Sequence, residues 1–124
     1  MKSITSNWAL RVRCNTLKQA EAALADILTM IGVRVNEPQF NAFPASNLPG
    51  VSRRGNDGSG YDIAFEIPHV ANDAGGALLE VILISRKLSS HWTIHFAPSG
   101  ESRGCASNLP GAHSPSIEWT LSLN

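Results

Sequence analysis

Residues 4–14 carry the first clear hydrophobic pattern of the chain. The polar residues Arg11 and Arg13 occupy odd positions, whereas the apolar residues occupy even ones. These apolar residues are Ile4, Trp8, Leu10, Val12 and Cys14. A period of two is typical of a β-strand with one buried face. The sequence therefore predicts a first strand whose arginines face solvent.

A helical pattern follows directly after this strand. Thr16 and Gln19 have the spacing of a capping box, in which each side chain accepts a bond from a backbone N–H at the start of a helix. The apolar residues then recur at helical spacing and are Leu17, Ala20, Leu24, Ile27, Leu28 and Ile31. Gly32 is the residue type that most often ends a helix in the left-handed conformation. The sequence therefore predicts one amphipathic helix with a single apolar stripe.

Four later segments indicate further strands. Tyr61–Ile67, Trp92–Phe96 and Ile117–Leu123 alternate between apolar and polar residues, which predicts strands with one exposed face. Leu78–Ile84 is nearly all apolar, which predicts a central strand covered on both faces. The turn at Leu88–Ser90 is short, so this central strand is expected to form an antiparallel hairpin with the next one.

The predicted elements together favour one fold class. A helix with one apolar stripe must cover the face of a sheet. The sequence predicts an α+β fold, a two-layer sandwich in which one main helix packs on a mostly antiparallel sheet of four to six strands. The chain of 124 residues fits a single domain, residues 1–124. Val33–Val35 or the last strand is expected at a sheet edge, where pairing with a second copy would give a homodimer.

Residues 36–59 and 98–115 are expected to be long loops, and each contains the string ASNLPG, at 45–50 and 106–111. Proline followed by glycine favours a type II turn. A duplicated domain would repeat its apolar patterns as well, so the repeat is interpreted as two turns rather than two domains. Loops of this length tend to be functional or disordered. They form either a shared recognition surface or two solvated turns.

Charge and cysteine content narrow the class of protein. Ten Lys and Arg residues balance ten Asp and Glu residues, so no field of one sign attracts nucleic acid or an anionic membrane. The N-terminal segment lacks the apolar run of a signal peptide, and no apolar run approaches the ~20 residues that span a bilayer. A cytoplasmic protein is expected. In that reducing setting Cys14 and Cys105 are expected to be unpaired thiols, with a disulfide between them as the alternative.

The candidate chemistry of the chain is sparse. His91 and His95 lie in a predicted strand, where residues four apart are separated by about 13 Å, too far to share a metal ion. His95 and Glu118 would form an acid and base pair if neighbouring strands brought them together, with Asp62 and Glu66 as further carboxylates. The wet face of any sheet gives the same polar alternation without chemistry. No cofactor, metal site or catalytic residue is therefore predicted.

The segments NWALRVRC, TLKQAEAALADILTMIG and ALLEVILISRKLSSHWTIHF give a layout that resembles the small single-domain immunity proteins of bacterial contact-dependent and polymorphic toxin systems. The resemblance is one of size and architecture. It implies a protein that is not an enzyme, that binds a cognate toxin domain in the cytosol and that neutralises the toxin by stoichiometric occlusion.

Protein interfaces depend on arginine and aromatic anchors, so the candidate contacts for such a partner are charged residues of the two loops. They are Arg53, Arg54, Asp57, Glu101 and Arg103. The alternative function is a small enzyme or ligand-binding domain with a cleft between sheet and loops. His95 and Glu118 are then the first polar groups to test.

Overall fold

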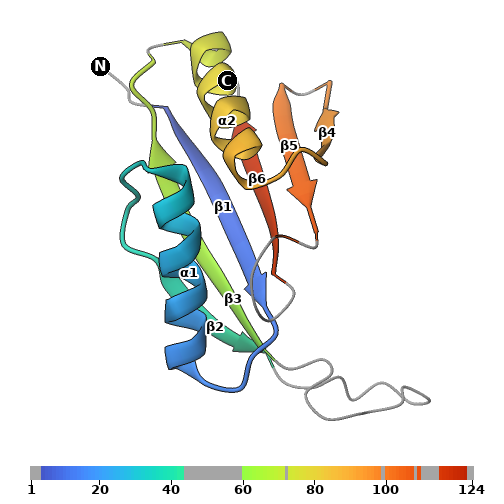
Figure 1. The fold of residues 1–124 in the computed structure, drawn as a ribbon. Coiled ribbons are helices and arrows are strands. Elements are labelled where there is room, and N and C mark those ends of the chain that lie inside the picture. Colours follow the sequence, from blue (N-terminus) through green and yellow to red (C-terminus); the bar gives the residue numbers. More distant parts are fainter. Residues whose placement is uncertain are drawn as a thin grey trace, which may run out of the picture.

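Among the residues that the structure describes, a six-stranded antiparallel sheet forms one layer and two helices form the other (Figure 1). The computed structural model describes residues 4–43, 60–71, 73–98, 100–107, 109 and 115–122. The expected α+β two-layer fold is confirmed, with a second helix beside the predicted one. The elements are β1 (Thr5–Val12), α1 (Leu17–Ile31), β2 (Gln39–Phe43), β3 (Gly60–Pro68), α2 (Ala74–Leu88), β4 (Thr93–Phe96), β5 (Glu101–Ala106) and β6 (Ser116–Ser122).

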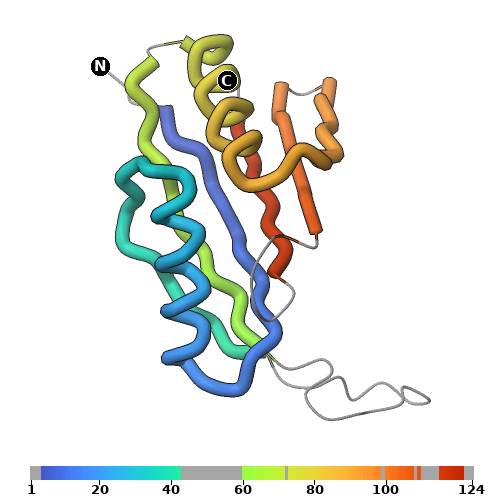
Figure 2. Tube along the Cα trace, viewed as in Figure 1, coloured from blue at the N-terminus to red at the C-terminus, as the bar shows by residue number. Residues whose placement is uncertain are grey.

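The strands lie in the order β2-β3-β1-β6-β5-β4, and every neighbouring pair is antiparallel. α1 links β1 to β2, and these two strands flank β3, which is a split β-α-β arrangement. α2 begins a second crossover, from β3 to β6 on the other side of β1 (Figure 2). The β4–β5 hairpin is inserted into this crossover and extends the sheet beyond β6. The N-terminal strand β1 is therefore central.

The edges of the sheet are β2 and β4, so both predicted edges are wrong. Val33–Val35 is not in a strand, and the last strand, β6, lies between β1 and β5. The last strand is internal because the inserted β4–β5 hairpin pairs with its outer side. A homodimer that forms through an edge strand would therefore have to pair β2 or β4 and not either predicted edge.

α1 forms as the sequence predicts. The Thr16 hydroxyl accepts the Gln19 N–H at 3.2 Å, and the Gln19 side chain accepts the Thr16 N–H at 3.2 Å, which completes the capping box. Gly32 ends the helix with φ 66°, and its N–H donates to the Leu28 carbonyl at 3.0 Å. The local signals of β1 and α1 are strong enough to fix both elements.

Leu78–Ile84, predicted as a central strand, lies inside α2, so that prediction is wrong. A short apolar run fits a buried strand and a buried helix equally well. Asp73 begins the helix, because its side chain accepts the Gly76 N–H at 2.7 Å. The buried residues then recur at helical spacing and are Ala77, Val81, Ile84, Ser85 and Leu88. The predicted hairpin between this segment and residues 92–96 is wrong for the same reason.

Both predicted loops contain a strand, β2 in the first and β5 in the second. β5 pairs with β4 and lacks a hydrophobic pattern because its buried residues are small. They are Ser102, Gly104 and Ala106. The first copy of ASNLPG lies outside the described residues, and only Ala106, Ser107 and Leu109 of the second copy are described. The predicted type II turns therefore fall outside the described residues.

The core lies between the sheet and the helices and centres on Trp8. The Trp8 ring stacks on Phe65 with centroids 6.2 Å apart, and it meets Trp119 at 6.3 Å and Trp92 at 6.4 Å. Aromatic pairs of this kind bury large apolar areas. Since these rings point toward the helices, the alternate residues of each strand emerge on the opposite side of the sheet.

Two further findings bear on the sequence expectations. No helix in the described ranges is long and apolar enough to cross a membrane. Cys14 and Cys105 are both free thiols. Cys14 is buried, and burial raises the pKa of its thiol, whereas Cys105 is exposed on β5.

Candidate functional site

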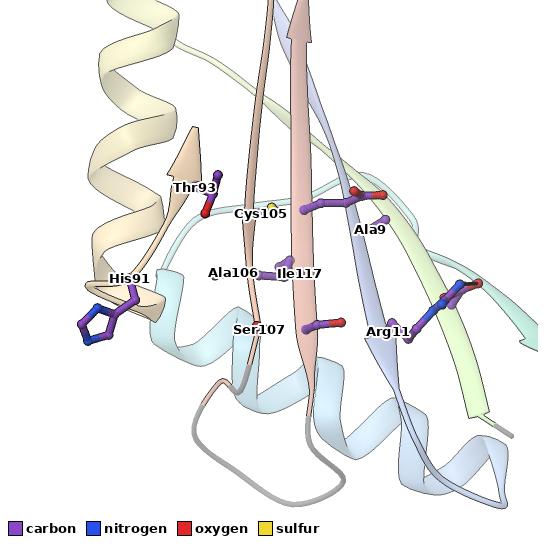
Figure 3. Close-up of a pocket in the computed structure, with 11 residues that line it drawn as sticks. Ala9, Arg11, His91, Thr93, Cys105, Ala106, Ser107 and Ile117 are labelled. Atoms are coloured by element: carbon purple, nitrogen blue, oxygen red, sulfur yellow. Dashed lines mark hydrogen bonds and ion pairs between the residues drawn. The ribbon is translucent and has the colours of Figure 1, made fainter. Parts of the chain in front are cut away.

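The side of the sheet that faces away from the helices carries exposed side chains from five strands. We call it the open face and define it by Asn7, Glu66, Thr93, Arg103 and Glu118, all exposed. These residues alternate with core residues along each strand, as the pleat of a β-strand requires. In Figure 3 the strands pass in front of α1, so α1 lies behind the sheet as seen from this side.

A hollow of about 500 Å³ lies in the open face over β1, β5 and β6 (Figure 3). Its position follows from side-chain size, because Ala9, Cys105 and Ser116 are small residues on adjacent strands. Sheet register places Glu118 between Ala9 and Cys105. Thr93 of β4 borders the hollow on its outer side. We refer to this feature as the hollow.

Arg11 and Asp62 form a two-pronged ion pair at one end of the hollow. Arg11 Nε donates to Asp62 Oδ1 at 2.7 Å, and Arg11 Nη2 donates to Asp62 Oδ2 at 3.1 Å. The hydrogen bond to Asp62 raises the pKa of Arg11 above its ordinary value. Both side chains are about half exposed, so the pair contributes little to stability and instead orients the guanidinium.

Glu118 is the remaining charged group of the hollow. Within the described chain its carboxylate makes no hydrogen bond or ion pair, although its charge attracts the Arg11 guanidinium. Because Arg11 and Asp62 carry opposite charges, Glu118 gives the described lining of the hollow a net negative charge.

The predicted partner-binding residues divide into two groups. Arg53, Arg54 and Asp57 lie outside the described residues. Glu101 and Arg103 were expected in a loop, but both lie on β5, and their side chains are exposed on the open face with Arg103 Nη2 and Glu101 Oε1 3.9 Å apart. The structure therefore brings these two residues onto the same surface as the hollow.

The acid and base pair considered for the alternative function, His95 and Glu118, is not assembled. His95 lies on β4 opposite Arg103, whereas Glu118 lies on β6 opposite Cys105. The two residues share a face, but two strand spacings separate their backbones by about 10 Å. The described part of the chain also holds no group of three or more His, Cys, Asp or Glu side chains suited to a metal ion.

A second polar cluster, which was not expected from the sequence, joins β1, the segment after β3 and α2. The Ser6 hydroxyl and His69 Nε2 are 2.7 Å apart, and His69 Nδ1 and Glu80 Oε1 are 3.1 Å apart. This connectivity is that of a Ser-His-acid triad. The signals in the sequence were a serine on the buried period of the first strand and a glutamate inside an apolar run.

The cluster lacks the access that a hydrolytic site needs. Ser6 is 0% exposed, and its hydroxyl oxygen accepts a hydrogen bond from Trp8 Nε1 at 2.7 Å. Glu80 also accepts the backbone N–H of Val70 at 3.2 Å and of Ala71 at 2.8 Å. The cluster therefore satisfies buried polar groups and ties the segment after β3 to α2.

Glu80 is ionised more easily than an ordinary glutamate. Burial alone would raise its pKa, but the hydrogen bonds from Ala71, His69 and Val70 outweigh that effect, so the pKa of Glu80 is lowered from 4.5. Its carboxylate form is the one that the fold stabilises.

The geometry leaves the open face, with its hollow, as the candidate functional site. Comparison of the chain with protein-family models, curated protein sequences and solved structures finds no match. Any functional conclusion therefore depends on the site itself.

Proposed function

We propose that this protein is an inhibitor that binds another protein through the open face, in the manner of an immunity protein. The observation that carries the proposal is the face itself. A hydrogen-bonded antiparallel sheet presents charged and polar side chains from five strands, with a hollow among them. Such a scaffold is already ordered, so little conformational entropy is lost when a partner binds.

The proposed partner is a toxin domain, and the proposed place of action is the cytosol of the cell that makes both proteins. The small α+β layout that resembles immunity proteins supports this choice. Binding would cover the active site or another essential surface of the toxin in a one-to-one complex. Inhibition of this kind requires a stable interface and no chemical step.

The residues of the open face suit a protein interface. Arg11 and Arg103 are arginines held near carboxylates, Asp62 and Glu101 respectively. Arginine is enriched among residues that dominate binding energy, and a pre-oriented guanidinium loses less entropy on binding. Arg53, Arg54 and Asp57, which lie outside the described residues, remain proposed contacts.

A matched pair of variants tests which side of the molecule binds. Ala64 is exposed on β3 in the open face, and Ala22 is exposed on α1 on the opposite side. Ala64→Trp should weaken binding of the proposed toxin domain, sought among the genes beside this one, by at least tenfold, since the indole obstructs close packing of two surfaces. Ala22→Trp should bind like the wild-type chain. Isothermal titration calorimetry measures both affinities.

Two results would count against the proposal. One is an Ala64→Trp variant that binds as tightly as the wild type, and the other is loss of binding in Ala22→Trp alone. Circular dichroism of each variant shows whether the fold is kept, so a folding defect is not mistaken for a lost contact.

The hollow supports a second candidate function, binding of a small ligand. Its volume of about 500 Å³ lies within the range of known ligand sites. A thermal-shift screen of metabolites tests this candidate. A true hit should raise the melting temperature of the wild-type protein but not that of a Cys105→Trp variant, in which the indole fills the hollow.

A further inference from the structure

We infer that the hollow accepts a lysine or arginine side chain of the bound partner, with Glu118 as its counter-ion. This inference rests on the proposed protein-binding function and names the chemistry that the partner presents. It concerns one subsite within the open face.

Glu118 is set between two small, uncharged residues of the sheet. Its neighbours in register are Ala9 on β1 and Cys105 on β5. Directly opposite residues in an antiparallel pair have Cβ atoms about 5 Å apart. Neither of these neighbours carries a charge or a long side chain. Arg11 and Arg103 stand at the diagonal positions, but each already lies beside another carboxylate, so among the described residues no cation forms an ion pair with Glu118.

The other described carboxylates of the open face already have partners. Asp62 accepts both bonds from Arg11, and Glu101 lies 3.9 Å from Arg103. Glu66 accepts a bond from the Asn36 side chain at 3.4 Å. Glu118 is therefore the carboxylate of this face, within the described residues, that an incoming cation finds unpaired.

A docked partner would change the hydration of Glu118. A protein surface that closes over the hollow removes water from the carboxylate, and a carboxylate that loses water without gaining a partner opposes binding strongly. An apolar or acidic side chain in the hollow would leave Glu118 in that state. A lysine or arginine side chain removes the penalty, so charge complementarity selects a basic occupant.

Cys105 provides a reporter inside the hollow that needs no partner protein. It is an exposed thiol directly opposite Glu118, whereas Cys14 is buried. Two methanethiosulfonate reagents of similar size, the cationic trimethylammonium-ethyl form and the anionic sulfonatoethyl form, are compared in low salt. Peptide mapping by mass spectrometry follows modification of Cys105 alone. The ratio of the two rates, divided by the same ratio for 2-mercaptoethanol, reports the local preference for positive charge.

The wild-type chain should show a normalised ratio of about tenfold in favour of the cationic reagent, because one charge about 6 Å away alters each rate by about threefold in a water-like dielectric. In Glu118→Gln the normalised ratio should fall to within about twofold of the value for the free thiol, which is unity by definition. Glu66→Gln is the matched control, since Glu66 lies on the same face but three strands from Cys105, and it should keep the wild-type ratio. Any effect of Glu118 on the thiol pKa changes both rates equally and cancels.

A wild-type ratio equal to that of the free thiol would overturn the inference, as would a ratio that Glu118→Gln leaves unchanged. Failure of both reagents to reach Cys105 would also overturn it, because the hollow would then be closed. None of these results affects the Ala64→Trp and Ala22→Trp comparison. The subsite and the protein-binding function can therefore fail separately.

Discussion

Gly104 lies under the indole ring of Trp119, and a Cβ built on Gly104 would come within 2.5 Å of two ring atoms. The ring is fully buried and belongs to a residue of the aromatic core, so it has no free space into which to move. A glycine in a strand often marks such a close approach. The β4–β5 hairpin can therefore pack against β6 in this position only because residue 104 has no side chain.

Gly104→Ala should destabilise the protein by about 1–3 kcal/mol, the usual cost of overpacking a filled core. Gly75→Ala is the matched control, because Gly75 lies in α2 and a Cβ there meets only Asp73 Oδ1, at 4.0 Å. That variant should be unchanged or more stable by about 0.5–1 kcal/mol, as alanine favours a helix. Urea denaturation measures both. Equal stability of Gly104→Ala and wild type would show that Trp119 does not pack on Gly104.

At the scale of elements, the sequence predicts those whose signals are local. β1, α1, β3 and β6 have long periodic patterns or paired caps, and all four form as predicted. α2 was mistaken for a strand because its apolar run is short. β5 was missed because its buried residues are small, and Trp119 of another strand covers one of them, Gly104. Both errors concern elements whose conformation depends on packing against segments distant in the sequence. The hydrophobic periodicity of a single segment carries no information about such packing.

The hydrogen bonds of Glu80 attach α2 to the sheet, and they depend on pH. The pKa of Glu80 is lowered in the fold from 4.5, so the folded state binds this proton less tightly than the unfolded state does. The stabilisation is therefore fully present above pH 4.5 and is lost as the pH falls through the lowered pKa. Because the side chain is 32% exposed, solvent screens part of the effect.

Glu80→Gln should reduce the free energy of unfolding at pH 7 by about 1 kcal/mol, since the amide keeps fewer of the hydrogen bonds. The difference from wild type should shrink as the pH falls below 4.5, where the wild-type carboxylate becomes protonated. Chemical denaturation at a series of pH values gives this curve, and Glu21→Gln, an exposed exchange on α1, controls for the loss of one charge. A difference that stays constant down to pH 3 would contradict the role given to Glu80.

For the molecule as a whole, the sequence predicted the exposure of the candidate-site residues but not their arrangement. The alternation of Arg11, Asp62 and Glu118 with core residues predicted that these side chains face solvent. Their position around one hollow depends on the strand order, in which the last strand lies beside the first. Strand order is a property of the folded chain. The sequence therefore indicated which polar residues are exposed but not which of them lie close together.

The placement of Glu101 and Arg103 illustrates the same point. Both were chosen as loop residues that contact a partner, and both belong to a strand of the open face. The residues were selected for their chemistry, and the surface on which they lie became evident only from the pairing of β5 with β6.

Labelling of Cys105 by a neutral maleimide, with and without the bound toxin domain, tests most directly whether the partner binds the open face. The thiol lies in the open face, so binding should slow its labelling at least tenfold, while an Ala22→Cys variant should keep an accessible label on α1. Labelling of Cys105 at the free rate in a complex proven by calorimetry would show that the partner binds elsewhere, and protection of residue 22 instead would place it on the helices.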